Sequence, residues 1–166
     1  MCVQLFGATS SPSCASFALR RTAEDGKERA PSEVTEAILN NFHDDDCLIL
    51  VPLDKHAVAL AKDLRTLCLS GGFHLTKWTS NSRVLLMSIP KEDRASEVKD
   101  LDLNNDQLPM ERPLGVQWCT NSDTFKFKIE VQEKPHMRRG ILSAISSAYD
   151  PLGFLSPFIL PAKFLF

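Results

Sequence analysis

One segment, residues 54–70, restricts the fold more than any other part of the chain. Its apolar residues recur at intervals of three and four, the spacing that lines up one face of an α-helix: Ala57, Val58, Ala61, Leu64, Leu67 and Cys68. We expect Asp54 to cap the first turn and Gly71 and Gly72 to end the helix. With 166 residues, the chain is long enough to build a core around this helix in one or two small domains.

The flanking segments predict a mixed α+β fold. Helices are expected from Ser11 and Pro12 to about Thr22, over 32–39 and over 138–149, with a solvated loop over 24–32. Short strands are expected over 47–51, where Pro52 ends an apolar run, and over 73–78 and 84–89. Residues 114–118 and 125–129 form the arms of a further hairpin around 121–123.

Composition and charge narrow the class of protein. With 43% hydrophobic and 24% charged residues, the chain is neither disordered nor low in complexity, and it has no apolar run long enough for a membrane helix and no secretory signal. The five cysteines are scattered without a Cys-x-x-Cys pair, which favours an intracellular, cytoplasmic setting. The net charge is −2, but residues 112–166 hold seven basic and four acidic residues, so any polyanion contact is expected there.

Three consecutive carboxylates, Asp44, Asp45 and Asp46, stand where the 47–51 strand begins. Aspartate is depleted inside strands, so we expect these residues at the tip of a hairpin whose first arm includes residues 41–43. Two unit charges about 4 Å apart repel by about 1 kcal/mol in water, and Mg²⁺, which prefers hard oxygen ligands, relieves such repulsion. An exposed acidic turn is the alternative. A zinc site between His43 and Cys47 is disfavoured because their spacing suits a helix better than a hairpin.

Several ordered blocks resemble the reverse transcriptase palm and thumb in the polyprotein of a BEL/Pao-type retrotransposon. They are Phe6-Gly7-Ala8-Thr9-Ser10-Ser11-Pro12-Ser13-Cys14-Ala15, Asn40-Asn41-Phe42, Gly72-Phe73-His74-Leu75-Thr76-Lys77-Trp78, Leu114-Gly115-Val116-Gln117-Trp118 and Tyr149-Asp150-Pro151-Leu152-Gly153. The resemblance extends over nearly the whole chain, since the first block begins at Phe6 and the last ends at Gly153.

The resemblance implies a partial palm over 1–111, an antiparallel sheet with two packed helices, then a primer-grip hairpin over 112–134 and the start of a helical thumb over 135–166. The implied activity is that of an RNA-directed DNA polymerase, which adds deoxynucleotides from dNTPs to a primer on an RNA or DNA template with Mg²⁺ as cofactor.

The resemblance also assigns roles to individual residues. Asp45 and Asp46 are the catalytic, metal-binding carboxylates, and Lys77 is the proton donor to departing pyrophosphate. The nucleotide-binding residues are Phe6, Gly7 and Ala8; the primer grip is Leu114, Gly115, Val116, Gln117 and Trp118; and the contacts to the nucleic-acid backbone are Lys126, Lys128, Arg138 and Arg139. Simpler interpretations stay open. Lys77 is then a surface lysine beside Trp78, residues 114–118 belong to an ordinary core hairpin, and the basic residues form a solvated face.

The chain departs from the family in two ways. The family hairpin reads Phe-Tyr-Val-Asp-Asp, whereas this chain has His43 and Asp44 in place of the tyrosine and the valine. The family's third metal-binding aspartate and its fingers precede the block at Phe6, so we expect the 166 residues to be inactive by themselves, as a fragment that works with the rest of a polyprotein. A noncatalytic nucleic-acid-binding or protein-interaction module is the alternative.

Overall fold

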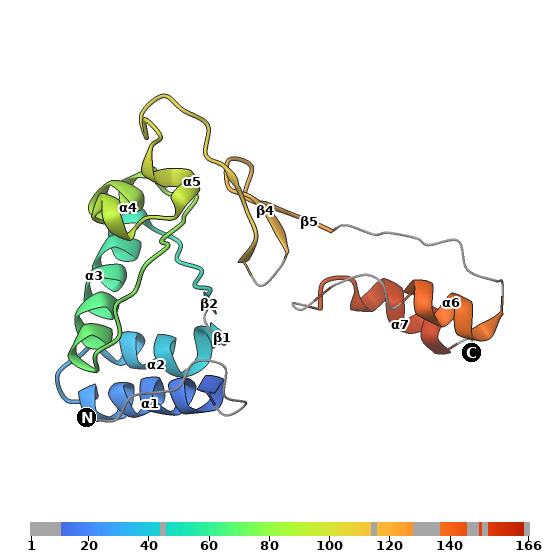
Figure 1. The fold of residues 1–166 in the computed structure, drawn as a ribbon, viewed down its shortest axis with the longest axis horizontal. Coiled ribbons are helices and arrows are strands. Elements are labelled where there is room, and N and C mark those ends of the chain that lie inside the picture. The colour runs from blue at the N-terminus through green and yellow to red at the C-terminus, as the bar shows by residue number, and fades with distance from the viewer. Residues whose placement is uncertain are drawn as a thin grey trace. The chain divides into compact units, whose positions relative to one another are not determined.

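The structure is a computed structural model that describes residues 11–43, 46–113, 116–127, 137–145, 150 and 153–164. The chain divides into two compact units, Met1–Gln107 and Leu108–Phe166, and each is described by itself (Figure 1). Both units combine helices with small antiparallel sheets, so the α+β class is confirmed at this coarse level. Among the helices in the described ranges, none is long and apolar enough to cross a membrane.

Three helices build the core of the first unit: α1 (Ser11–Gly26), α2 (Ser32–Asn41) and α3 (Asp54–Ser70). Their buried side chains meet in one cluster: Leu19, Ala23, Val34, Ala37, Ile38, Leu60, Leu64, Leu67 and Cys68. The prediction for α3 is confirmed, including its end, where Gly72 takes a φ of 83° and the Phe73 N–H donates to the Cys68 carbonyl at 2.9 Å. Asp54 is the first helical residue, and its side chain does not cap the helix.

Helix α1 is longer than predicted. We expected it to end near Thr22, yet it continues to Gly26 because Ala23 and Gly26 are both buried against neighbouring helices. Packing therefore extends the helix into a segment whose polar composition is typical of a loop. Helix α2 begins at Ser32, as predicted.

A short hairpin follows α2, formed by β1 (Phe42–His43) and β2 (Asp46–Cys47). The expected hairpin is confirmed, but the buried strand over 47–51 is wrong. Regular pairing ends at Cys47, and Leu50 is 89% exposed. Ile49 and Val51 pack against the core as irregular chain, because no described segment pairs with them as a neighbouring strand.

The predicted strands over 73–78 and 84–89 are also wrong. Residues 73–77 run as irregular chain, and Trp78 makes a single parallel bridge to Arg94. Residues 83–88 form α4 (Arg83–Ser88), whose first turn is capped by Ser82, since its hydroxyl accepts the Leu85 N–H at 3.2 Å. The 3₁₀ turn η1 (Lys91–Asp93) and α5 (Ser96–Lys99) complete the unit. Short apolar runs fit helix and strand equally well, and here the cap decides.

The second unit contains the sheet β3 (Met110–Glu111), β4 (Gln117–Cys119) and β5 (Thr124–Lys126), in that order, and the helices α6 (Arg138–Ile145) and α7 (Ser156–Phe164). The predicted turn between the β4 and β5 arms is confirmed, with Asp123 at a φ of 51°. The helix predicted over 138–149 is present as α6 up to Ile145, and residues 146–149 lie outside the described ones. Before α7, Gly153 has a φ of 75°, and the Asp150 carboxylate accepts the N–H groups of Phe154 and Leu155 at 2.9 and 2.7 Å.

The unit boundary at Gln107 lies close to the predicted end of the palm at residue 111. The predicted boundary between hairpin and thumb, at 134 and 135, lies outside the described residues. The division into palm, primer grip and thumb stays a prediction.

Candidate functional site

The β1–β2 hairpin carries the candidate catalytic carboxylates. Phe42 pairs with Cys47 and His43 with Asp46, so two residues, Asp44 and Asp45, connect the strands. These two lie outside the described residues, whereas the Asp46 side chain is exposed on β2. The hairpin that the sequence predicts here is present, but Asp46 lies in strand β2, paired with His43, rather than at the hairpin tip where we expected it.

The base of the hairpin is tied to the end of α2. The Leu48 N–H donates to the Asn41 carbonyl at 3.1 Å, and the Asn41 side-chain amide donates to the Leu48 carbonyl at 2.8 Å. Phe42 packs against the core cluster of the first unit. Asp46 thus lies on a short ladder that is fixed at its base by both polar and apolar contacts.

The hairpin register separates His43 from Cys47. Residues paired across an antiparallel ladder share a face, and neighbours along a strand alternate, so His43 lies on the face of Asp46, and Cys47 lies on the opposite face with Phe42. Although Cys47 as a residue is exposed, desolvation of its sulfur and the neighbouring Cys68 thiol raise its pKa to about 12. A neutral thiol on the wrong face does not complete a zinc site with His43.

Lys77, the predicted proton donor, is exposed and has a φ of 58°, in the left-handed region that non-glycine residues rarely adopt. The chain on either side of it is held by hydrogen bonds. The Trp78 indole N–H donates to the Leu75 carbonyl at 3.1 Å, and the Trp78 main-chain N–H donates to the Asp93 carbonyl at 2.9 Å.

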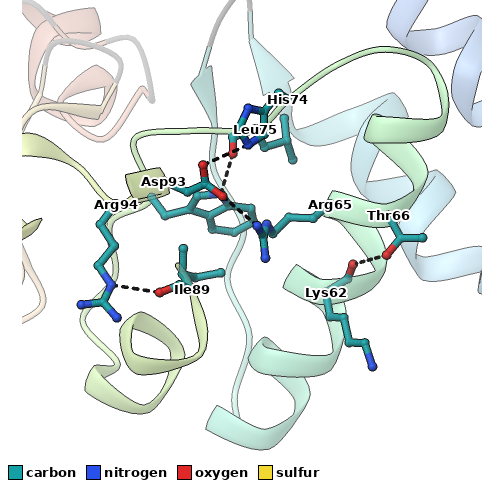
Figure 2. Close-up of polar contacts among 9 residues, drawn as sticks. Lys62, Arg65, Thr66, His74, Leu75, Ile89, Asp93 and Arg94 are labelled. Atoms are coloured by element: carbon teal, nitrogen blue, oxygen red, sulfur yellow. Dashed lines mark hydrogen bonds and ion pairs between the residues drawn. The ribbon is translucent and has the colours of Figure 1, made fainter. Parts of the chain in front are cut away.

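A buried ionic cluster lies next to this segment. Asp93, only 3% exposed, accepts a hydrogen bond from the Arg65 guanidinium of α3 at 2.7 Å, and its second oxygen lies 2.9 Å from His74 Nε2. Figure 2 shows Arg65 and His74 reaching this one carboxylate from two different segments. Sequence patterns do not predict this cluster, because Asp93 lies among several acidic residues that neither spacing nor composition distinguishes.

In the second unit, the described residues of the predicted primer grip and Lys126 of the predicted basic surface lie on or next to one sheet. Val116 is buried, Gln117 and Trp118 are half-buried on β4, and Gln117 pairs directly with the exposed Lys126 of β5. The Trp118 indole N–H donates to the Asp123 carboxylate at 3.0 Å, and its ring stacks on Phe125 with centroids 6.4 Å apart. These contacts are those of a well-packed hairpin.

Other predicted residues are only partly described. Arg138 is the first residue of α6, and Arg139 is exposed on the same helix. The following lie outside the described residues: Phe6, Gly7, Ala8, Asp45, Leu114, Gly115 and Lys128. Within the described ranges, no group of three or more histidine, cysteine or acidic side chains is arranged to hold a metal ion.

Comparisons of the chain with protein-family models, with curated proteins and with solved structures found no match.

Proposed function

We propose that this chain supplies part of the palm and the beginning of the thumb of a retroelement reverse transcriptase of the BEL/Pao type. In this proposal Asp45 and Asp46 bind the catalytic metal ions, and Gln117, Trp118 and their neighbours hold the primer end. The basic residues of 112–166 contact the nucleic-acid backbone without reading its sequence.

The observation that carries the proposal is the hairpin. The β1–β2 hairpin precedes the long helix α3, as the resemblance implies, although the apolar strand that the resemblance places between them is irregular chain here. A solvated acidic turn would require neither the fixed ladder below it nor the partly buried Phe42 that packs against the core.

The donor chemistry of the hairpin suits magnesium. Asp46 has an exposed carboxylate and directly follows Asp45 in the sequence. The neighbouring Cys47 thiol stays neutral at physiological pH, so the ligands available at the hairpin are hard carboxylate oxygens. Asp45 and Asp46 would hold the metal, which when bound would polarise the phosphate undergoing transfer. The exposed carboxylate of Asp46 carries the negative charge that attracts the ion to this end of the hairpin.

The first test is metal-dependent nucleotide chemistry on a primer–template duplex. The chain is assayed for primer extension, and for Mg²⁺-dependent binding of a dNTP, alone and with Asp45→Asn or Asp46→Asn. Asp54→Asn, which removes an exposed carboxylate at the start of α3, is the matched control. We expect Mg²⁺-dependent dNTP binding that both hairpin variants lose and the control keeps; equal binding by all four proteins would contradict the metal assignment.

Primer extension tests the polymerase activity itself, separately from the binding of Mg²⁺ and dNTP. Template-dependent incorporation that disappears in Asp45→Asn would support the polymerase assignment together with the metal assignment.

The second test is duplex affinity as a function of salt. We expect the affinity for an RNA–DNA duplex to fall as salt rises, with a log–log slope reduced by about one for each phosphate contact that is lost. Arg138→Ala/Arg139→Ala should reduce both affinity and slope. Arg20→Ala/Arg21→Ala, an adjacent exposed pair on α1, changes the net charge equally and should have little effect.

One observation favours the alternative, a protein-interaction module. Several large apolar side chains of the second unit are exposed: Met137, Phe154, Phe158, Leu160 and Phe164. Exposed apolar side chains in such number are typical of surfaces that contact another protein. A chain that shows no salt-sensitive duplex affinity and self-associates in sedimentation would support this alternative over the polymerase.

A further inference from the structure

We infer that Asp93 is a positioning residue for Lys77: together with Arg65 and His74, its buried carboxylate holds the 73–78 segment so that Lys77 is kept exposed in a left-handed backbone conformation. The inference rests on the proposed function only for what Lys77 then contacts, the pyrophosphate group that leaves during nucleotide transfer.

The starting observation is the backbone of Lys77. Its φ of 58° is unfavourable for a residue with a β-carbon, and lysine has no short polar side chain with which to stabilise it locally. Conformations of this kind persist only where the surrounding structure imposes them, and they concentrate at functional sites. Lys77 is also exposed, so no burial of its own side chain accounts for the conformation.

The surrounding structure imposes it from both sides. On the N-terminal side, His74 is bound to the Asp93 carboxylate at 2.9 Å, and the Leu75 carbonyl accepts the Trp78 indole N–H. On the C-terminal side, the main chain of Trp78 is held by the Asp93 carbonyl and by the Ala95 N–H, each at 2.9 Å. Asp93 takes part on both sides, through its side chain and through its backbone.

The carboxylate of Asp93 is a strong anchor because it is buried and ionically paired. Its side chain is 4% exposed, while that of Arg65 is 30% exposed and that of His74 is 63% exposed. Arg65 belongs to α3 and contributes the rigid end of the contact, whereas His74 belongs to the segment being held. A buried carboxylate that is paired with the Arg65 guanidinium and bonded to the His74 imidazole resists displacement, since moving either partner away leaves a buried polar group less satisfied.

This arrangement gives Lys77 a fixed starting point for its flexible side chain. A primary ammonium that must meet a leaving phosphate group works best when its backbone is already in place, because positioning then costs little at the moment of reaction. Asp93 touches no substrate in this proposal and acts through the conformation of residue 77.

The test couples the strain at Lys77 to the anchor at Asp93. Lys77→Gly relieves the left-handed strain and Lys77→Ala does not, so the difference in Tm between these two variants reports the strain. We expect this difference to be several degrees in the wild-type background, to disappear with Asp93→Asn, and to persist with Asp100→Asn, an exposed carboxylate in the same region. If Asp93→Asn does not fold, His74→Ala is used instead, because it removes a contact to the Asp93 carboxylate by changing an exposed side chain.

An equal difference in Tm between Lys77→Gly and Lys77→Ala in the wild-type, Asp93→Asn and His74→Ala backgrounds would overturn the positioning role.

A second readout measures acetylation of the Lys77 amine, with and without inorganic pyrophosphate and Mg²⁺. Protection in the wild type that weakens in Asp93→Asn and recovers in Asp93→Glu supports the full inference. Strain coupling without protection keeps the positioning role and removes the pyrophosphate contact, so the two failures are distinguishable.

Discussion

Gly71 lies directly against Thr22, so that a β-carbon added at Gly71 would overlap the Thr22 hydroxyl and methyl groups. Thr22 is held in place because its hydroxyl donates to the Ala18 carbonyl one turn earlier, at 3.0 Å. Gly26 is similarly close to Leu67. Helices α1 and α3 therefore approach each other through glycines, and their separation sets the shape of the core on which the hairpin rests.

Gly71→Ala should destabilise the first unit by about 1–3 kcal/mol, as overpacking does when the neighbouring side chain is stiff. Urea denaturation measures the change. Thr22→Ala in the Gly71→Ala background should recover part of the loss, because it removes the overlapping hydroxyl and methyl groups. Gly72→Asn is the control for the turn itself: position 72 has open space, and asparagine tolerates its φ of 83°. A loss at Gly72→Asn equal to that at Gly71→Ala would show that the turn, rather than the helix contact, sets the cost.

The chain after the hairpin gives a second prediction. Leu50 is 89% exposed, whereas Ile38 is 1% exposed within the core cluster. Leu50→Ala should change the free energy of unfolding by no more than about 0.5 kcal/mol, and Ile38→Ala should reduce it by about 2–5 kcal/mol because it leaves a cavity. Chemical denaturation of both variants checks the difference. A large loss at Leu50 would restore the buried strand that the sequence predicts over 47–51.

The sequence predicts a helix or strand correctly where the apolar pattern that indicates it is long. Helix α3 has several turns of apolar periodicity and a glycine stop, so both its extent and its end could be predicted. Residues 83–88 offer only one short apolar run, and a hydrogen bond from Leu85 to Ser82 makes it a helix. The end of α1 depends on contacts with α3 that no local pattern contains.

Within the candidate site, too, features with a local sequence signal could be predicted and long-range contacts could not. The hairpin around Asp45 could be predicted because aspartates and a following apolar run are local signals. The contacts of Asp93 could not, because its partners Arg65 and His74 are 28 and 19 positions away in the sequence. Only the folded chain brings such residues together, since neither spacing nor composition pairs one particular acid with one particular base.

Asp102 gives a prediction for acid conditions. Hydrogen bonds from the Asn104 backbone N–H and the Asn105 side chain hold the pKa of its carboxyl below the usual range. A carboxyl whose pKa is lowered in the folded state stabilises that state above its unfolded pKa of about 4 and loses the contribution as the pH falls through the lowered value. Asp102→Asn should therefore flatten the dependence of unfolding free energy on pH in the acid range. Urea denaturation of both proteins at a series of acid pH values measures this slope.

Cys47, Cys68 and Cys119 should differ in reactivity because, of these three, Cys119 alone has a stabilised thiolate. Hydrogen bonds from the Ser122 side chain and backbone lower the pKa of Cys119, whereas burial raises the pKa of Cys68 to about 11 and desolvation raises that of Cys47 to about 12. Since the thiolate is the nucleophile, iodoacetamide near neutral pH should modify Cys119 before Cys47 or Cys68, as peptide mass mapping would show.

The serine next to Cys119 provides the control for this last prediction. Ser122→Ala removes the largest stabilising contact and should shift the pH profile of Cys119 alkylation upward, because the thiol then ionises at higher pH. Ser88→Ala removes an exposed hydroxyl that bonds only within α4, to the Leu85 carbonyl, and should leave the profile unchanged. An identical profile in Ser122→Ala and the wild type would mean that the thiolate owes its stability to other groups, with Lys126 the nearest charged candidate.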